Sequence, residues 1–252
     1  MKYLSIAAIT ALFNCAVPQN AMAADIRVSS IPGVKAALVQ LLPRFEAETG
    51  HRVAIVYEIY AGQKQRLDAG EFDVAIFADT HIQELVAQTK VDPKSTAKLA
   101  RTSIGVAVRK GAPKPDIASE AAIKRTLLAA KSIAFTKESS TGQHVYRLLQ
   151  RLGIADEVLA KSKPQPGGNM TTPAVAAGEV ELAIVLISDI VAHPGVDLVG
   201  PLPPGLQNEV VQVAGVGTTA RDADAAATLI RFLASPIARP VFKATGLEPA
   251  GP

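Results

Sequence analysis

The chain has 252 residues, with 26 Lys and Arg against 23 Asp and Glu, for a formal net charge of +3. The basic residues are scattered rather than clustered, so the charge gives little support to binding of nucleic acid or of a membrane surface. Hydrophobic residues make up 48% of the chain, which is ample for a packed core in one large domain or two smaller ones. Beyond the N-terminal segment, no apolar run approaches the roughly 20 residues that span a bilayer.

The N-terminal residues predict an export signal. Lys2 is followed by the apolar run from Leu4 to Val17 and then by Ala21-Met22-Ala23, the small-x-small pattern that signal peptidase cleaves. We therefore expect residues 1–23 to be a signal peptide and the mature protein to be periplasmic. Cys15 is the only cysteine, so the mature chain is expected to have no thiol or disulfide chemistry.

Strand-like apolar runs alternate with helical patterns along the rest of the chain. This alternation predicts an α/β fold with a mainly parallel sheet covered by helices. In chain order we expect strands at residues 26–28, 53–57, 74–77, 104–108, 133–135, 182–186 and 210–213. Helices are expected at residues 34–49, in the segment ending at 67, from about 140 to 152, after 172, at 222–233 and up to about 242.

Three strand-to-helix turns are rich in small polar residues. They are Ser29-Ser30, Ser139 to Gly142, and Asn169 to Thr172. Ligands of open α/β sheets bind outside the carboxyl ends of strands, and helix N-termini favour anions. At any single turn, a Ser, Thr or Asn is more simply explained as a helix cap. Three such turns together favour a site for a small anion.

Four segments resemble the periplasmic molybdate-binding protein family of ABC importers. They are Phe45 to Gly50, Gly70 to Asp79, Ala177 to Val185, and Phe232 to Pro236, in the family's order and spread over essentially the whole mature chain. The resemblance implies a two-lobed periplasmic-binding-protein fold, each lobe a mainly parallel sheet flanked by helices, with a ligand cleft between the lobes. It also implies that residues 24–107 and 201–252 form one lobe and residues 108–200 the other.

The same resemblance places three departures at expected ligand positions. Gly33 stands near the place of a family Ser, Ile59-Tyr60-Ala61-Gly62 replaces a Ser-rich turn, and Leu186 falls on a family Tyr. A net hydrogen bond contributes only about 0.5–1.5 kcal/mol, and somewhat more to a charged group, so an oxyanion needs many donors. We therefore expect weak molybdate binding and a changed ligand, either a small organic acid or another oxyanion.

The expected ligand-binding residues come from these turns and their neighbours. They are Ser29, Ser30, Tyr60, Ser140, Thr141, Asn169, Met170 and Thr171. Hydroxyls and helix N-termini would hold the charge, while Tyr60 and Met170 would contact the less polar part of the ligand. We expect no catalytic residue, no metal and no cofactor. The partners expected are a small anion and an ABC permease of the inner membrane, with no nucleic acid, and the protein is expected to be a monomer.

Two alternatives remain open. Ser95-Thr96-Ala97-Lys98 matches the S-x-x-K pattern of periplasmic serine acyl-transferases and hydrolases, although the partner motifs are missing and a solvated helical face is the simpler explanation. The other alternative is a receptor subunit that binds the same kind of ligand and signals.

Overall fold

The structure, a computed structural model, describes residues 23–165 and 168–251. Its strands are β1 (Asp25–Ser30), β2 (Arg52–Tyr57), β3 (Val74–Ala78), β4 (Ala97–Arg109), β5 (Ile133–Ala134), β6 (Leu182–Leu186), β7 (Val196–Pro201), β8 (Glu209–Val216) and β9 (Glu248–Pro249). Its α-helices are α1 (Lys35–Thr49), α2 (Lys64–Asp68), α3 (Asp79–Ala87), α4 (Glu120–Ala129), α5 (Ser140–Arg151), α6 (Ala155–Ala160), α7 (Gly168–Ala176), α8 (Ile187–Val191), α9 (Ala223–Leu233) and α10 (Arg239–Ala244). Short 3-10 turns are η1 (Pro32–Val34), η2 (Ala61–Gln63), η3 (Pro93–Ser95) and η4 (Pro204–Leu206).

The predicted signal peptide lies almost wholly outside the described residues. Within the described ranges, no helix combines the length and the apolar character needed to cross a membrane.

The strands pair in the order β2-β1-β3-β8-β4-β6-β5, and β7 and β9 also pair with β4. Parallel pairing joins β1 to β2 and β3, and β5 to β6. The pairs made by β4 and β8 are antiparallel. The sheet is therefore mixed, where the sequence predicted a mainly parallel one. The long strands β4 and β8 are paired with each other and run in opposite directions, which crossover helices between parallel strands do not produce.

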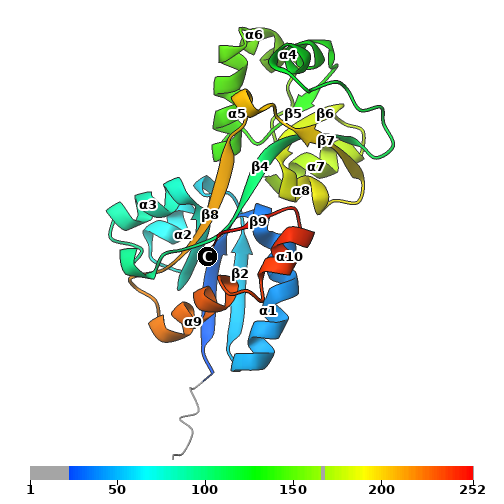
Figure 1. Cartoon of the computed structure of the whole chain (residues 1–252). Coiled ribbons are helices and arrows are strands. Elements are labelled where there is room, and N and C mark those ends of the chain that lie inside the picture. The colour runs from blue at the N-terminus through cyan, green and yellow to red at the C-terminus, as the bar shows by residue number, and fades with distance from the viewer. Residues whose placement is uncertain (1–22, 166–167, 252) are drawn as a thin grey trace, which may run out of the picture.

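Strand β4 changes partners along its length. Residues 97–103 pair with β8, whereas residues 104–109 pair with β6 and β7. We call β1, β2, β3, β8, β9 and residues 97–103 the first sheet region, and β5, β6, β7 and residues 104–109 the second sheet region. Figure 1 shows these as two bodies with β4 and β8 running between them. The proposed lobe boundaries at residues 107 and 200 stay a prediction.

Helices cover the first sheet region on both faces. Helix α1 turns Leu38, Leu41 and Phe45 inward because residues three and four apart share a helix face. These side chains pack with residues of α9 and α10 in one apolar cluster. Residues of α2 and α3, including Leu67 and Ile82, pack in a second cluster with strands β3 and β8.

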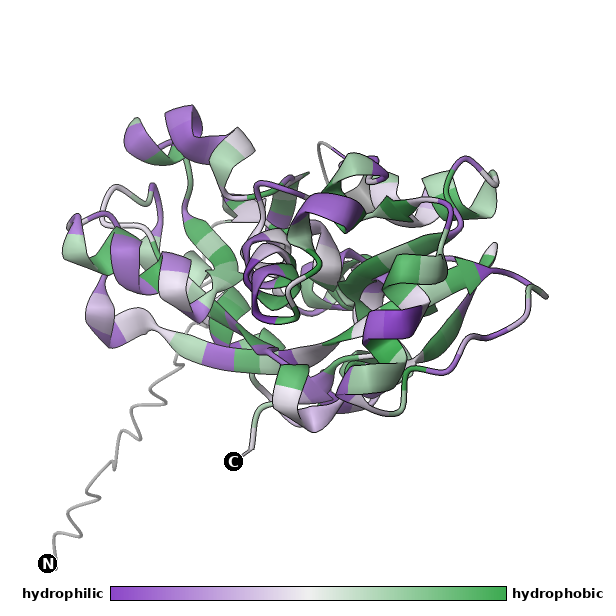
Figure 2. Ribbon diagram, turned by 90° about the horizontal axis from the view of Figure 1, so that it is seen from above, coloured by the Kyte–Doolittle hydropathy of each residue, from purple (hydrophilic) through white to green (hydrophobic). Residues whose placement is uncertain are grey.

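The second sheet region has the same layered build. Residues of α4, α5 and α6 form one apolar cluster with strands β4 and β6, and residues of α7 and α8 form another. Seen from above, the hydrophobic colour is concentrated along the strands and the hydrophilic colour on the outer helical turns (Figure 2). Each region therefore has its own buried core.

The predicted strands and helices are largely confirmed, with two corrections. The segment from Ser95 to Lys98 is not a helical face, because η3 ends at Ser95 and β4 begins at Ala97. The strand expected at residues 104–108 therefore extends back by several residues. The polar turn Asn169 to Thr172 is not a turn before a helix, because α7 already begins at Gly168.

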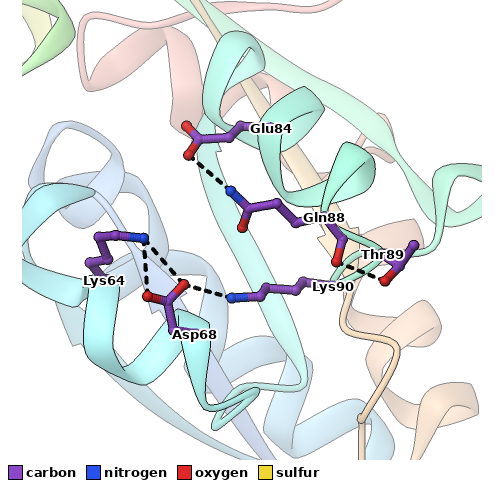
Figure 3. A network of polar contacts seen from close by, with 6 residues as sticks. All are labelled: Lys64, Asp68, Glu84, Gln88, Thr89 and Lys90. Carbon is purple, nitrogen blue, oxygen red and sulfur yellow. Dashed lines mark hydrogen bonds and ion pairs between the residues drawn. The ribbon is translucent and has the colours of Figure 1, made fainter.

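A buried ion pair anchors the start of the first sheet region. The Asp73 carboxylate accepts hydrogen bonds from the Arg27 backbone N–H at 2.7 Å, from Arg27 Nε at 3.1 Å, from Arg27 Nη2 at 2.8 Å and from the Arg221 N–H at 2.9 Å. Burial opposes ionisation of Asp73, but these hydrogen bonds together outweigh it and hold the pKa of the carboxyl below its ordinary value. An exposed network between α2 and the end of α3 contrasts with this pair, since Asp68 there accepts from Lys64 and Lys90 at the surface (Figure 3).

Candidate functional site

A cavity lies where the two sheet regions face each other. It is narrow: the volume open to the centres of water molecules is ≈ 50 Å³, room for a few waters. The first sheet region and its turns contribute Ile31, Pro32, Gly33, Ile59, Tyr60, Ala78, His81 and Val210. The second region contributes Thr136, Ser139, Ser140, Thr141, Ile184, Val185, Leu186 and Asp189. Most of these residues lie at or just after the carboxyl ends of strands β1, β2, β3, β5 and β6, the usual place for a ligand in α/β proteins.

The turn after β1 touches the second sheet region directly. A Cβ atom added to Gly33 would lie 2.9 Å from Leu186 Cδ1, so only glycine allows this approach without displacing Leu186. Gly33 and Leu186 therefore close one end of the cavity by direct contact. Neither residue supplies a hydroxyl there.

The N-terminus of α5 forms the opposite wall. Ser139 caps this helix by accepting from the Gly142 N–H at 3.0 Å, and its hydroxyl donates to the Thr136 carbonyl at 2.9 Å. A Cβ atom on Gly142 would lie 1.8 Å from the Thr136 oxygen, so glycine is required for this tight entry into the helix. The entry brings Ser140, Thr141 and the positive end of the helix dipole to the cavity.

Two stacked rings form an uncharged wall. The rings of Tyr60 and His81 lie 4.1 Å apart and 4° from parallel, and the Phe77 ring meets Tyr60 edge-on at 5.3 Å. Burial, together with the nearby charge of Glu84, raises the pKa of Tyr60 to about 12. Burial also lowers the pKa of His81, although Glu84 opposes this effect. Both rings are therefore predominantly neutral at pH 7.

Asp189 supplies the only acidic group among the cavity-lining residues of the described chain, and none of them is Lys or Arg. It lies in α8, which follows directly from the buried strand β6. Burial raises the pKa of its carboxyl to about 7, although the residue keeps some exposed surface. The carboxyl can therefore gain or lose a proton near neutral pH.

The structure brings Tyr60, Ser140 and Thr141 together in the cavity, as predicted from the sequence. It does not bring the other candidates there. Ser29 and Ser30 are buried strand residues paired with β2 and β3, and the turn begins only after them. The Thr171 hydroxyl shares a hydrogen bond with Thr136 at 3.1 Å, and Met170 is 48% exposed away from the lining. The side chain of Asn169 lies outside what the structure describes.

Sequence reasoning missed His81 and Asp189. Both follow a buried strand by three residues, His81 after β3 and Asp189 after β6. The rule that ligands lie beyond the carboxyl ends of strands would have pointed to both. Neither residue belongs to a turn rich in Ser, Thr or Asn, the pattern on which the predicted site was based.

The other histidines have structural partners. His51 Nδ1 accepts from the Ala24 N–H at 3.1 Å, His144 Nε2 lies 2.8 Å from the Leu206 carbonyl, and His193 Nδ1 accepts from the Gly195 N–H at 3.1 Å. In the described part of the chain, no three His, Cys, Asp or Glu side chains gather in a way that would hold a metal ion.

Ser95 and Lys98 are not arranged as a nucleophile and base. The Ser95 hydroxyl donates to the Asp92 carbonyl at 2.7 Å and accepts from the Val216 N–H at 2.8 Å, and both residues lie outside the cavity. Lys98 is an exposed strand residue. The geometry therefore gives no support to a serine acyl-transferase built on these two residues.

Known proteins similar to this chain include bacterial solute-binding proteins. The family model described as bacterial extracellular solute-binding protein matches residues 26–248. An aconitate isomerase from a Pseudomonas species is 30% identical over 231 residues, which cover 89% of this chain and 87% of that protein. The molybdate-binding protein ModA of Azotobacter vinelandii is 27% identical over 258 residues, covering 98% of this chain and 97% of that protein.

A solved structure shows the same fold. The periplasmic molybdate-binding protein of Azotobacter vinelandii superposes with a TM-score of 0.75 at 20% identity, covering 90% of this chain and 99% of that one. These matches confirm the α/β periplasmic-binding-protein fold and the resemblance to molybdate-binding proteins. The chain belongs to the family of bacterial extracellular solute-binding proteins.

Proposed function

We propose that the protein is a periplasmic solute-binding protein that holds a small organic acid in the cavity between the two sheet regions. It would deliver this ligand to an ABC permease of the inner membrane, without catalysing a reaction. One observation carries the proposal, namely a small cavity with hydroxyls and a helix N-terminus on one wall and neutral rings on another. Such walls suit a ligand that has both a carboxylate and a hydrocarbon part.

The lining favours an organic acid over a tetrahedral oxyanion. Ile31, Ile59, Ile184 and Val185 are among the residues that line the cavity, and their side chains offer no hydrogen bonds. A tetrahedral dianion such as molybdate exposes oxygen on every side, so each apolar contact would leave an oxygen without a donor. A carboxylate concentrates its charge at one end and leaves the rest of the molecule for these residues.

A thermal-shift panel on the chain from residue 24 tests this proposal. The panel compares molybdate, tungstate and sulfate with citrate, cis-aconitate, trans-aconitate and smaller dicarboxylates. A ligand at 100 times its dissociation constant should stabilise the protein by about 2.7 kcal/mol, which corresponds to roughly 5–11 °C in Tm. We expect an organic acid to give the largest shift. Absence of a shift with every anion would overturn the binding proposal.

Transport can be separated from signalling by measuring uptake. A strain that lacks this protein should lose periplasm-dependent uptake of the organic acid and regain it with the full chain, whose residues 1–23 carry the predicted export signal. Intact uptake combined with a lost transcriptional response to the acid would instead identify a receptor subunit. Gel filtration is expected to give a monomer.

An isomerase is the second candidate function. It is favoured by the 30% identity to an aconitate isomerase together with an acidic group, Asp189, in the cavity. Moving a double bond between cis- and trans-aconitate requires removal of a proton from one carbon and delivery of a proton to another. A carboxyl with a pKa of about 7 is suited to both steps at neutral pH.

Proton NMR distinguishes the two candidates. An isomerase would convert trans-aconitate into a mixture with cis-aconitate, and Asp189→Asn would abolish the conversion. A binding protein would leave each isomer unchanged over hours at stoichiometric protein, even where calorimetry detects binding. We expect the second result.

A further inference from the structure

Asp189 separates the cavity from a second hollow on the outside of the protein. This hollow, which we call the outer groove, offers ≈ 390 Å³ to the centres of water molecules and is lined in part by Lys35, Thr172, Ser188 and His193. Pro32, Gly33 and Asp189 line both spaces. The Asp189 carboxyl can therefore face a ligand in the cavity and still exchange a proton with water in the groove.

The carboxyl also lies at the contact between the two sheet regions. Asp189 belongs to α8 beside the second region, yet its Oδ1 would lie 3.8 Å from a Cβ atom added to Gly33, in the turn after β1 of the first region. The carboxyl therefore lies where a turn of the first region approaches the second. Among the described residues, burial alone shifts the pKa of this carboxyl, with no contribution from a hydrogen bond or a nearby charge.

The groups around Asp189 do not neutralise a negative charge inside the cavity. Across the cavity the titratable side chains are Tyr60 and His81, and on the groove side they are Lys35 and His193. Helix α7 and strands β4, β6 and β7 meet α8 through an apolar cluster. The cluster contains Ala107, Val175, Val185, Ile190 and Val196. Burial raises the pKa of the carboxyl to about 7, which agrees with these surroundings.

We propose that Asp189 determines ligand specificity in the cavity by requiring a proton at this position when an anion binds. This inference rests on the proposed function of the cavity. With the proton present, the carboxyl donates a hydrogen bond to an oxygen of the ligand. The proton comes from water in the outer groove. Without the proton, two negative charges face each other across a lining that contains no Lys or Arg, so binding of an anion is disfavoured.

Ligand binding should therefore be coupled to proton uptake. If binding needs the protonated carboxyl, affinity is nearly constant below the pKa and falls tenfold for each pH unit above it. From pH 6 to pH 8, the dissociation constant should then increase by about tenfold. The change would come from the protein, because molybdate remains a dianion throughout this range.

The test is calorimetric titration of molybdate at pH 6 and pH 8. It uses the wild-type chain, Asp189→Asn, and Asp156→Asn as a control in the exposed part of α6. At pH 8 we expect Asp189→Asn to bind molybdate at least about tenfold tighter than wild type, with no difference between the two pH values, because the amide carries no charge. The control should behave as wild type. Titrations of wild type in two buffers of different ionisation enthalpy count the protons directly and do not depend on the folding of any variant.

Four outcomes decide the matter. Proton uptake at pH 7 together with a pH-independent Asp189→Asn variant supports the inference. Equal molybdate affinity in all three proteins at both pH values overturns the inference but leaves anion binding intact. If wild type binds the organic acids with no proton uptake, only the inference fails. If no anion binds any of the proteins, the proposed function fails with it.

Discussion

Asp73 is buried and Asp189 is only partly exposed, and their surroundings differ in nearly every respect. Asp73, just before β3, accepts hydrogen bonds from the Arg27 side chain and from two backbone N–H groups, and its pKa is lowered. At the cavity, burial raises the pKa of the Asp189 carboxyl to about 7. The first carboxylate is built into the fold. The second lacks the partners that would keep it charged.

Other polar groups near the cavity resemble Asp189 rather than Asp73. Among the described residues, both amide atoms of Gln212 and the hydroxyl of Ser188 are buried without a hydrogen-bond partner. Gln212 lies opposite the cavity residue Ala78 in the β3–β8 pair, and Ser188 precedes Asp189. Since most buried polar groups in folded proteins are paired, these unpaired groups contrast with the fully paired Asp73.

Removal of Asp73 should have the largest effect on stability. Asp73→Ala leaves Arg27 and the Arg221 N–H without their acceptor in a buried site, which should lower the free energy of unfolding by about 3–5 kcal/mol. Urea unfolding followed by circular dichroism measures it. Asp68→Ala is the matched control, because its lysine partners are at the surface, and its urea midpoint should stay close to wild type. Equal urea midpoints for the two variants would show that the buried ion pair stabilises the fold no more than the exposed one.

Asp189→Asn should increase the stability of the protein at high pH. A carboxyl whose pKa rises on folding favours the native state at low pH, and this contribution is lost as the pH rises through about 7. At pH 8 the amide should therefore stabilise the ligand-free protein by about 1–3 kcal/mol, a range reduced because the residue keeps some contact with solvent. Near pH 4 the gain should vanish. Urea unfolding at both pH values measures this, and a loss of stability at pH 8 would contradict the assigned surroundings of Asp189.

Thr141→Ala should weaken ligand binding while the fold stays intact. If the Thr141 hydroxyl at the N-terminus of α5 bonds a charged group of the ligand, its removal should cost about 1–3 kcal/mol of binding free energy. Calorimetric titration with the organic acid that gives the largest thermal shift measures it. Ser95→Ala should bind as wild type, because Ser95 lies outside the cavity. An unaffected Thr141→Ala variant would mean that this turn does no more than begin a helix.

The sequence predicted the layered α/β fold well, because its strands and helices have strong and distinct hydrophobic periods. It predicted the cavity only in part. The Ser139 to Gly142 turn was found because it combines a helix cap with small residues, and Ser140 and Thr141 do line the cavity. Ser29 and Ser30 lie in a turn-like sequence but remain in β1, since their backbone pairs with β2 and β3.

The antiparallel pairing is beyond what local patterns reveal, and Asp189 can be found by its place after a buried strand but not by its surroundings. The first half of β4 carries charged and polar residues such as Lys98 and Arg101 on its exposed side, which hides its apolar alternation. The surroundings of Asp189 depend on its proximity to Gly33, more than 150 residues earlier in the chain, and on burial between two sheet regions. Both properties arise from tertiary packing.

The most direct test of the proposed function is a pair of calorimetric titrations at pH 7 on the chain from residue 24. One uses molybdate and the other uses the organic acid that gives the largest thermal shift. The apolar lining and the contact of Gly33 with Leu186 predict that the organic acid binds at least about tenfold tighter, a difference of roughly 1.4 kcal/mol. Tighter binding of molybdate would contradict the proposal and show that the cavity keeps a complete set of oxyanion donors.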